Sequence, residues 1–350
     1  MRKHYLDNLR WATVLLVLVY HVFYMFNGVG VLGGIPNAKN IPFFDGVSTL
    51  IYPWFMVLLF VIAGMSARYA FDKKTNKEFI RERARKLIVP SSLGLLVIHW
   101  VTGYLNIKMG GGLDYIPKAL IYPISVASGG GPLWFIQMLF IFSCLLVLIK
   151  KIDKDRFWNN CKNASTPVIF LKFIAVFLSA QILNLPVFTM YRFGIYFVVF
   201  LIGYFVLSHD DVQSRIEKAK WWSLGLAAAF GVWYGIKFIG TNFTSDECLK
   251  NIVTNMYLWF VVLTVLGFGK RYFNKPMAYM TKSSFGIYIL HYLVLISLCY
   301  VLTTYFNLPA ILNYAIALAL GIVLTFAVYE AIKRIPVIRY LVLGIKKNIK

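Results

Sequence analysis

The sequence concentrates reactive side chains in its first apolar run, YLDNLRWATVLLVLVYH, which contains Asp7, Arg10 and His21. The eleven residues from Arg10 to His21 make three helical turns plus about 20°, so a helix places both on one face, roughly 16 Å apart along its axis. Arginine binds phosphate through paired hydrogen bonds, and a neutral imidazole accepts a proton from a hydroxyl group. Asp7, one turn before Arg10, is placed to hold its guanidinium group.

This spacing suits a long ligand that is phosphorylated at one end and reactive at the other. A coenzyme A thioester has that shape, because a slender arm joins its phosphates to the reactive carbonyl. The alternative is that His21 only packs in the protein and is satisfied by a backbone carbonyl group. The arginine on the same face favours the reactive interpretation.

A second candidate site is the basic segment FIRERARKLIVP, in which cations alternate with Glu78 and Glu82. The cations are Arg81, Arg83, Arg85 and Lys86. Guanidinium and ammonium groups form charge-assisted hydrogen bonds with phosphate, so the segment is a candidate rim for the phosphates of a nucleotide-based donor. The alternative is that these cations only retain the loop on the cytoplasmic side of a membrane.

Ionisable residues inside other apolar runs are costly there and are therefore functional candidates. His291, in SFGIYILHYLVL, is expected near the middle of its run, either facing His21 or hydrogen-bonded to a neighbouring helix. Arg192 suits either an acceptor site or an anchor at the membrane interface. Further candidates for lining the site are Tyr20, Trp134 and Tyr288.

The other ionisable residues in apolar runs have simpler interpretations. We interpret His99 as structural, and Lys172 and Lys237 as side chains near span ends that extend to the interface. Glu330 lies four residues before Arg334, which favours an ion pair on the helix surface. The four cysteines show neither a CxxC pair nor metal-ligand spacing, so no metal site is expected.

These side chains must be positioned by membrane-spanning helices. Of the 350 residues, 59% are hydrophobic and 14% are charged, against about 45–50% and about 25% in soluble domains. The apolar residues fall in ten runs of the length that crosses a bilayer as a helix. These predicted spans are about 9–27, 47–70, 86–106, 130–149, 166–185, 187–207, 221–240, 252–269, 284–305 and 310–332. The segment 115–127 is short and broken by proline, and is expected to be interfacial or re-entrant.

The positions of the basic residues predict the orientation. The net charge of +22 would suggest nucleic acid in a soluble protein, but loops on the cytoplasmic side of a membrane also collect Lys and Arg. With the N-terminus inside, 29 of the 36 Lys and Arg residues fall in inner loops or termini and four in outer loops. We therefore predict one all-α integral membrane domain over residues 1–350, with both termini cytoplasmic and no nucleic-acid partner.

The sequence resembles the membrane-bound acyltransferase 3 family, which includes bacterial glycan O-acyltransferases. Its blocks LDNLRWATVLLVLVYH, PWFMVLLFVIAGMSARY, RARKLIVP, GPLWFIQMLFIFS and SFGIYILH resemble the family's motifs in the same order, from residue 6 to about 340. The resemblance implies a ten-helix core and a bacterial inner-membrane enzyme. It also implies acyl transfer, commonly of acetyl or succinyl, from cytoplasmic acyl-CoA to a hydroxyl group of a glycan or small acceptor.

By this resemblance, His21 carries the essential imidazole, Arg10 supports it or binds the donor, and Arg83 with Lys86 approaches the CoA phosphates. The sequence departs from the family pattern at Ala63, where the family usually has serine, and at Lys86, where it has arginine. The ending YEAIKRIPVIRYL resembles stand-alone members without the esterase-like extracytoplasmic domain.

Two other functions remain open from the sequence. A proton-coupled transporter or flippase would use His21, His291 and Arg192 to relay protons or bind an anion. A non-catalytic scaffold for envelope-glycan assembly would not need His21. The sequence leaves open the acceptor, the acyl chain length, the oligomeric state and whether the acyl group crosses the membrane before transfer.

Overall fold

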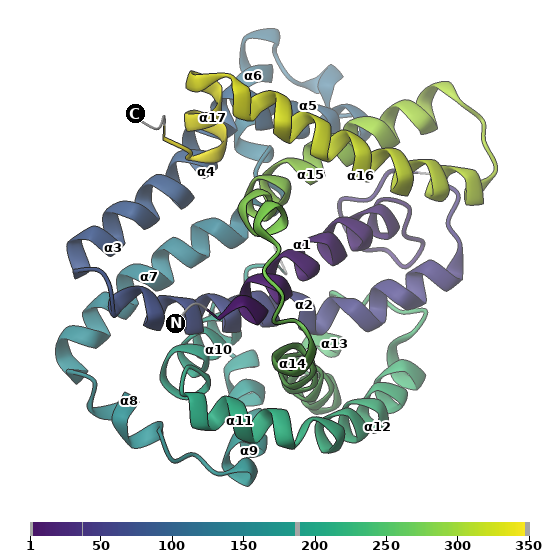
Figure 1. Cartoon of the computed structure of the whole chain (residues 1–350). Coiled ribbons are helices and arrows are strands. Elements are labelled where there is room, and N and C mark those ends of the chain that lie inside the picture. The colour runs from purple at the N-terminus through teal and green to yellow at the C-terminus, as the bar shows by residue number, and fades with distance from the viewer. Residues whose placement is uncertain (1–2, 37, 186–189, 347–350) are drawn as a thin grey trace. The chain divides into compact units, whose positions relative to one another are not determined.

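The computed structural model describes residues 3–36, 38–185 and 190–346, and their regular structure is helical (Figure 1). The first helices are α1 (His4–Met25), α2 (Pro42–Phe71), α3 (Asn76–Arg83), α4 (Val89–Gly94), α5 (Trp100–Met109), α6 (Ile121–Ser128), α7 (Trp134–Asp153), α8 (Arg156–Cys161) and α9 (Thr166–Ala180). They are followed by α10 (Phe193–Ile202), α11 (Asp210–Lys218), α12 (Lys220–Phe238), α13 (Asp246–Lys250), α14 (Ile252–Tyr272), α15 (Ala278–Tyr305), α16 (Ala310–Arg334) and α17 (Pro336–Leu343).

Shorter helical turns complete the chain. The π-helical turns are η1 (Ala84–Ile88), η2 (Leu95–His99) and η6 (Gly203–Leu207). The 3-10 turns are η3 (Leu113–Tyr115), η4 (Lys118–Leu120) and η5 (Gly131–Leu133).

Seven helical segments of the described residues are long and apolar enough to cross a membrane. They are His4–Met25, Pro42–Phe71, Asn76–Met109, Gly131–Asp153, Ile252–Tyr272, Ala278–Tyr305 and Ala310–Arg334. The pair Phe193–Leu207 and Asp210–Lys218, bent by 100°, makes an eighth if it is one span. This is a multi-pass membrane protein.

Each of the ten predicted spans overlaps a helix, but three of these helices do not meet the same test alone. α9 has only 15 residues, and the segment of α10 and η6 passes the test only together with α11, against which it is bent. α12 is not among the seven candidate spans. Residues 187–189, predicted to begin the sixth span, lie outside the described residues. The count of ten and the orientation of the termini therefore stay predictions.

Two π-helical turns interrupt the segment from α3 to α5, close to Pro90. Proline has no N–H group to donate to the carbonyl group of Lys86 four residues earlier, and an α-helix there loses a hydrogen bond. The helix widens in η1, immediately before this position, and again in η2. Single π-helical turns of this kind are frequently found at functional sites.

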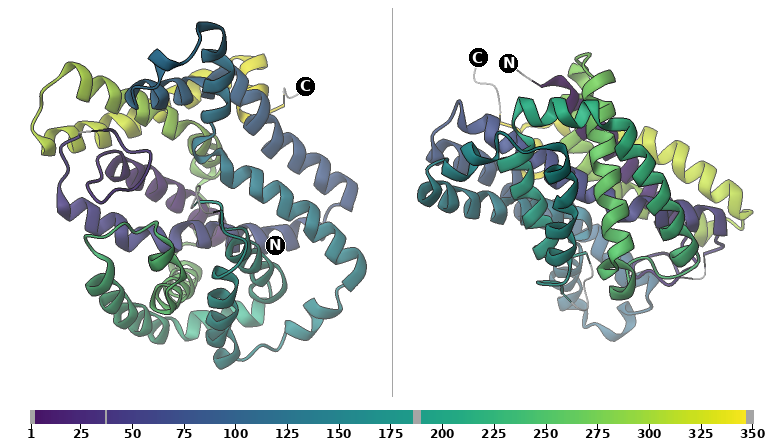
Figure 2. Two further views of the ribbon diagram at one scale, coloured as in Figure 1. Left: turned by 180° about the vertical axis from the view of Figure 1, so that it is seen from behind. Right: turned by 90° about the horizontal axis from the view of Figure 1, so that it is seen from below.

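The described chain divides into two compact units, and the division falls within several helices. Unit 1 contains Met1–Thr13, Thr49–Ile80 and Ile141–Thr281, and unit 2 contains Val14–Ser48, Arg81–Phe140 and Lys282–Lys350. In unit 1, α12 and α14 lie side by side (Figure 2). Tyr234 of α12 stacks on Tyr257 of α14, with ring centroids 5.2 Å apart.

Unit 2 has an apolar core built from α1, α15 and α16. Leu18, Val22 and Phe26 follow each other at four-residue spacing, and they pack with Leu295 and Ala317. In lipid, burying apolar surface between helices gains little, so close packing and hydrogen bonds must hold the helices together.

A glycine permits a close helix contact in unit 2. A Cβ atom at Gly103 of α5 would lie 1.9 Å from the carbonyl oxygen of Ser125 in α6, so only glycine allows this approach. The segment predicted to be interfacial or re-entrant is thus a short helix packed on α5. In the same unit, α17 packs against α4 and α16 (Figure 1).

Candidate active site

Two histidines meet inside unit 2, one from α1 and one from α15. Nε2 of His291 lies 3.3 Å from Nδ1 of His21, and the two rings are 4.9 Å apart between centroids. His291 is completely buried, whereas His21 is partly exposed. Of the two arrangements expected for His291, the one that faces His21 is present, and the role of His291 stays a prediction.

The partners of each ring assign its tautomer. Nδ1 of His21 lies 2.7 Å from the carbonyl oxygen of Val17, and Nδ1 of His291 lies 2.6 Å from that of Tyr288. A carbonyl oxygen only accepts, so both Nδ1 atoms carry the proton. The N–H group of His21 then faces the lone pair on Nε2 of His291, and the Nε2 atom of His21 keeps its own lone pair.

The Nε2 atom of His21 is therefore the basic atom of the pair. It has no hydrogen-bond partner within the described residues. A histidine whose other ring nitrogen is held by a hydrogen bond has a fixed orientation and tautomer, as a general base requires. The backbone carbonyl contact expected of a packing histidine is thus present, and the reactive role of His21 stays a prediction.

Aromatic rings surround His21. Tyr20, Tyr24 and Tyr292 place their rings edge-on, with centroids 5.1, 5.7 and 5.3 Å from that of His21. Tyr20 was predicted from the sequence, whereas Tyr24 and Tyr292 were missed. The position of Tyr24, three residues after His21 and on the same helix face, is a signal that would have found it.

Tyr288 connects the histidine pair to the start of α7. Its hydroxyl group donates to the carbonyl oxygen of Pro132 at 2.6 Å, and its ring lies 5.3 Å from that of Phe135. Phe135 in turn contacts Trp134, at 6.3 Å between centroids. These contacts bring the SFGIYILH and GPLWF blocks together, although lining roles for Tyr288 and Trp134 stay predictions.

In unit 1, the guanidinium group of Arg10 contacts Asp7 and Ser66. Its Nη1 atom lies 3.1 Å from Asp7, so the predicted ion pair is present, and its Nη2 atom donates to the hydroxyl oxygen of Ser66 at 2.7 Å. Sequence reasoning noted the missing hydroxyl at Ala63 but overlooked Ser66, three residues later. A role of Arg10 in donor binding stays a prediction.

The cations of the basic segment differ in their contacts. Lys86 pairs with Glu82 at 2.7 Å, while Arg81 is exposed and has neither a hydrogen bond nor an ion pair within the described residues. The Nε atom of Arg85 is buried and has no hydrogen-bond partner there either. Arg83, at the end of α3, directly precedes η1, which contains Arg85 and Lys86.

Other ionisable residues of the membrane runs have structural contacts. Arg192, in unit 1, is 3% exposed and donates from Nη2 to the carbonyl oxygen of Leu249 at 3.0 Å. A role of Arg192 at an acceptor site stays a prediction. Glu330 pairs with Lys333, at 3.0 Å, on the surface of α16.

His99 is buried in the π-helical turn η2, and its Nε2 atom has no hydrogen-bond partner within the described part of the chain. The described residues also contain no group of three or more His, Cys, Asp or Glu side chains arranged to hold a metal ion.

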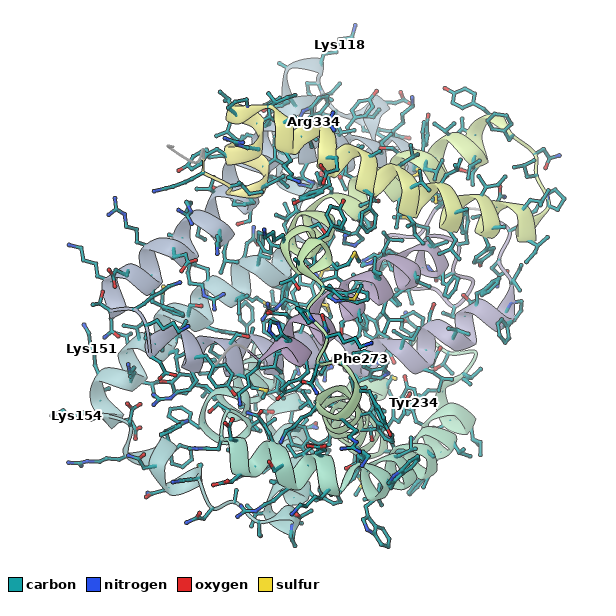
Figure 3. All side chains as sticks on the ribbon, viewed as in Figure 1. Lys118, Lys151, Lys154, Tyr234, Phe273 and Arg334 are labelled. Carbon is teal, nitrogen blue, oxygen red and sulfur yellow. The ribbon has the colours of Figure 1, made fainter. Side chains whose placement is uncertain are left out.

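Basic residues predicted in inner loops include Lys151 and Lys154, whose side chains extend away from the ribbon at the end of α7 (Figure 3).

Comparison with known proteins identifies the family. A family model described as an acyltransferase domain, acyltransferase 3, matches residues 3–330. No curated protein and no solved structure shows a significant match. Together with its membrane-spanning helices, this match shows that the chain belongs to the acyltransferase 3 family of membrane acyltransferases.

Proposed function

We propose that this protein transfers an acyl group from acyl-CoA to a hydroxyl group of a glycan or other small acceptor, with His21 as the general base. The observation that carries the proposal is the His21–His291 contact. In this contact the proton of His21 is held on Nδ1 by the Val17 carbonyl oxygen, and the lone pair is left on Nε2 of the more exposed of the two residues.

In this reaction the acceptor hydroxyl group gives its proton to Nε2 of His21 while its oxygen attacks the thioester carbonyl carbon. The resulting tetrahedral intermediate collapses, the carbon–sulfur bond breaks, and CoA leaves as a thiolate that takes the proton back from Nε2. The products are an ester and free CoA. A well-placed general base contributes about 10²- to 10⁴-fold to such a reaction.

His291 stabilises the charged form of His21 in this scheme. When His21 is protonated on Nε2, its Nδ1–H group still donates to the Val17 carbonyl oxygen and to the Nε2 lone pair of His291. Hydrogen bonds from an ionised donor are roughly twice as strong as neutral ones. The two acceptors therefore favour proton transfer to His21.

The basic segment in unit 2 is the proposed binding site for the donor phosphates. Among the described residues, Arg81 and the Nε atom of Arg85 have no hydrogen-bond partner, and guanidinium N–H groups suit the 3′-phosphate or diphosphate of acyl-CoA. Acetyl-CoA and succinyl-CoA are the proposed donors, and the bacterial inner membrane is the proposed location. The match to acyltransferases favours this enzyme over a transporter or flippase.

The test is release of free CoA by the purified protein in detergent, with acetyl-CoA or succinyl-CoA as donor. Without an acceptor, water takes the place of the acceptor hydroxyl group, so we expect slow hydrolysis of acyl-CoA to the free acid and CoA by the wild type and at least a 100-fold loss in His21→Gln. His4→Gln, a histidine substitution at the start of the same helix, is the matched control and should retain the wild-type rate. Equal rates in His21→Gln and the wild type would refute His21 as the base.

A further inference from the structure

Unit 2 contains a cleft of about 390 Å³ where α15 ends, α16 begins and the segment between α1 and α2 passes. Sites for small molecules typically occupy about 300–1,000 Å³. Lys39, in the cleft wall, is one of the four basic residues in the predicted outer loops. The cleft does not include the histidine pair or the basic segment.

The side chains that line the cleft suit a ligand with many hydroxyl groups. Tyr300 and Phe306 provide aromatic surface, Thr303 provides a hydroxyl group, and Asn307 and Asn313 provide amides. Amides and hydroxyl groups both donate and accept hydrogen bonds, as the hydroxyl groups of a sugar do. The aromatic rings offer apolar faces to the C–H side of a sugar ring.

One lining residue has an unmet hydrogen bond. Asn313 is 5% exposed, and its Oδ1 atom is buried without a hydrogen-bond partner among the described residues. A buried acceptor left unpaired costs about 1–3 kcal/mol. The Oδ1 atom is closed to the cleft as it stands, so the amide must turn before a ligand hydroxyl group can donate to it and recover that energy.

One hydrogen bond joins two parts of the cleft wall. Nζ of Lys39 donates to Oδ1 of Asn307 at 3.0 Å, which ties the segment before α2 to the connection between α15 and α16. The NH₂ group of Asn307 and the second lone pair of its oxygen are left for a ligand. The ammonium group of Lys108 also lies 5.2 Å from the centre of the Tyr300 ring.

The register of α15 fixes how far the cleft lies from the histidine pair. Tyr300 and Thr303 follow His291 by nine and twelve residues on one continuous helix, which is about 14 and 18 Å along its axis. A ligand group in the cleft is therefore remote from the reacting atoms. Binding energy from such remote parts of a substrate positions the reacting group.

We propose that this cleft binds a saccharide portion of the acceptor, away from the hydroxyl group that is acylated. The proposal rests on the proposed function, because it makes the cleft the determinant of acceptor specificity. It predicts that an acceptor must extend beyond one sugar ring to react well.

Direct binding tests the cleft without relying on turnover. Titration calorimetry of the full chain in detergent would use maltotriose as a neutral probe, trigalacturonate as an acidic probe and glycerol 1-phosphate as a polyol without a ring. We expect at least one saccharide to bind, with binding weakened at least tenfold in Asn313→Leu and in Tyr300→Ala. Tyr115→Ala, an exposed tyrosine outside the cleft, is the matched control and should bind as the wild type does.

The outcomes separate the cleft from the proposed reaction. Binding of neither saccharide, equal binding of glycerol 1-phosphate, or binding that survives both cleft substitutions would overturn the saccharide site. Cleft-dependent binding without His21-dependent CoA release would instead overturn the proposed function and leave the cleft as a saccharide site. Tyr300 is partly exposed, so Tyr300→Ala remains informative if Asn313→Leu fails to fold.

Discussion

Replacement of His291 by phenylalanine tests the geometry of the histidine pair most directly. The change keeps an aromatic ring in the buried site and removes the Nε2 lone pair that faces Nδ1 of His21 at 3.3 Å. The stronger acceptor of the same N–H group, the Val17 carbonyl oxygen at 2.7 Å, remains. We therefore expect a moderate loss of activity rather than a complete one.

The size of this loss follows from the contact. A hydrogen bond to a charged group is worth about 1.5–3 kcal/mol. The His21–His291 distance is slightly beyond the ordinary range for nitrogen donors, and the proton is shared with Val17, so the lower value applies. About 1.5 kcal/mol corresponds to roughly a tenfold lower rate constant for acyl transfer.

The assay is single-turnover release of CoA by purified His291→Phe, beside the wild type and His21→Gln. His291→Gln is the matched control, because its amide oxygen offers an acceptor in place of the imidazole lone pair. Thermal unfolding would show that each variant is folded. A loss in His291→Phe as large as in His21→Gln would refute the assigned roles, and an unchanged rate would refute the stabilising contact.

Three further predictions concern unit 1. Ser66→Ala removes the 2.7 Å hydrogen bond to Arg10. If Arg10 binds the donor, the KM for acyl-CoA should rise about tenfold, and an unchanged KM would exclude that role. Burial lowers the pKa of His209, in the connection between η6 and α11, below its ordinary value of 6.5. Below pH 6.5 the unfolded chain therefore binds more protons at His209 than the folded chain does, so the Tm of the wild type should fall as the pH drops through 6.5. The fall should be smaller in His209→Gln, and equal falls in the two proteins would contradict the prediction. Gly64→Val places a Cβ atom 2.0 Å from the carbonyl oxygen of Phe200 and should lower Tm by several degrees or prevent folding, as thermal unfolding would show.

The sequence by itself determined the membrane class and the position of most helices. A helix that crosses a membrane must satisfy all of its backbone hydrogen bonds internally and present apolar side chains to lipid, so its signal is local and strong. All ten predicted spans accordingly overlap helices. The short α9 and the bent segment of α10 and η6 show where length alone does not establish a crossing.

The contact of Asp7 with Arg10 was also predictable, because residues three apart on a helix are neighbours. The family motifs likewise identified His21, His291 and the basic segment as candidates. Such signals depend on residues close in sequence or on the order of known blocks. They carry no information on which atoms of distant helices meet.

Only the tertiary structure decided the details of the site. The contact of His291 with His21 joins residues 270 positions apart, and the contact of Ser66 with Arg10 joins residues 56 positions apart. The cleft that contains Asn313 is likewise lined by residues from separate segments of the chain. Helix packing in lipid depends on small residues such as Gly103 and on side-chain shape, and hydropathy does not encode it. The assignment of the basic nitrogen to Nε2 of His21 follows from two backbone carbonyl groups, so folding decided the chemistry of that histidine.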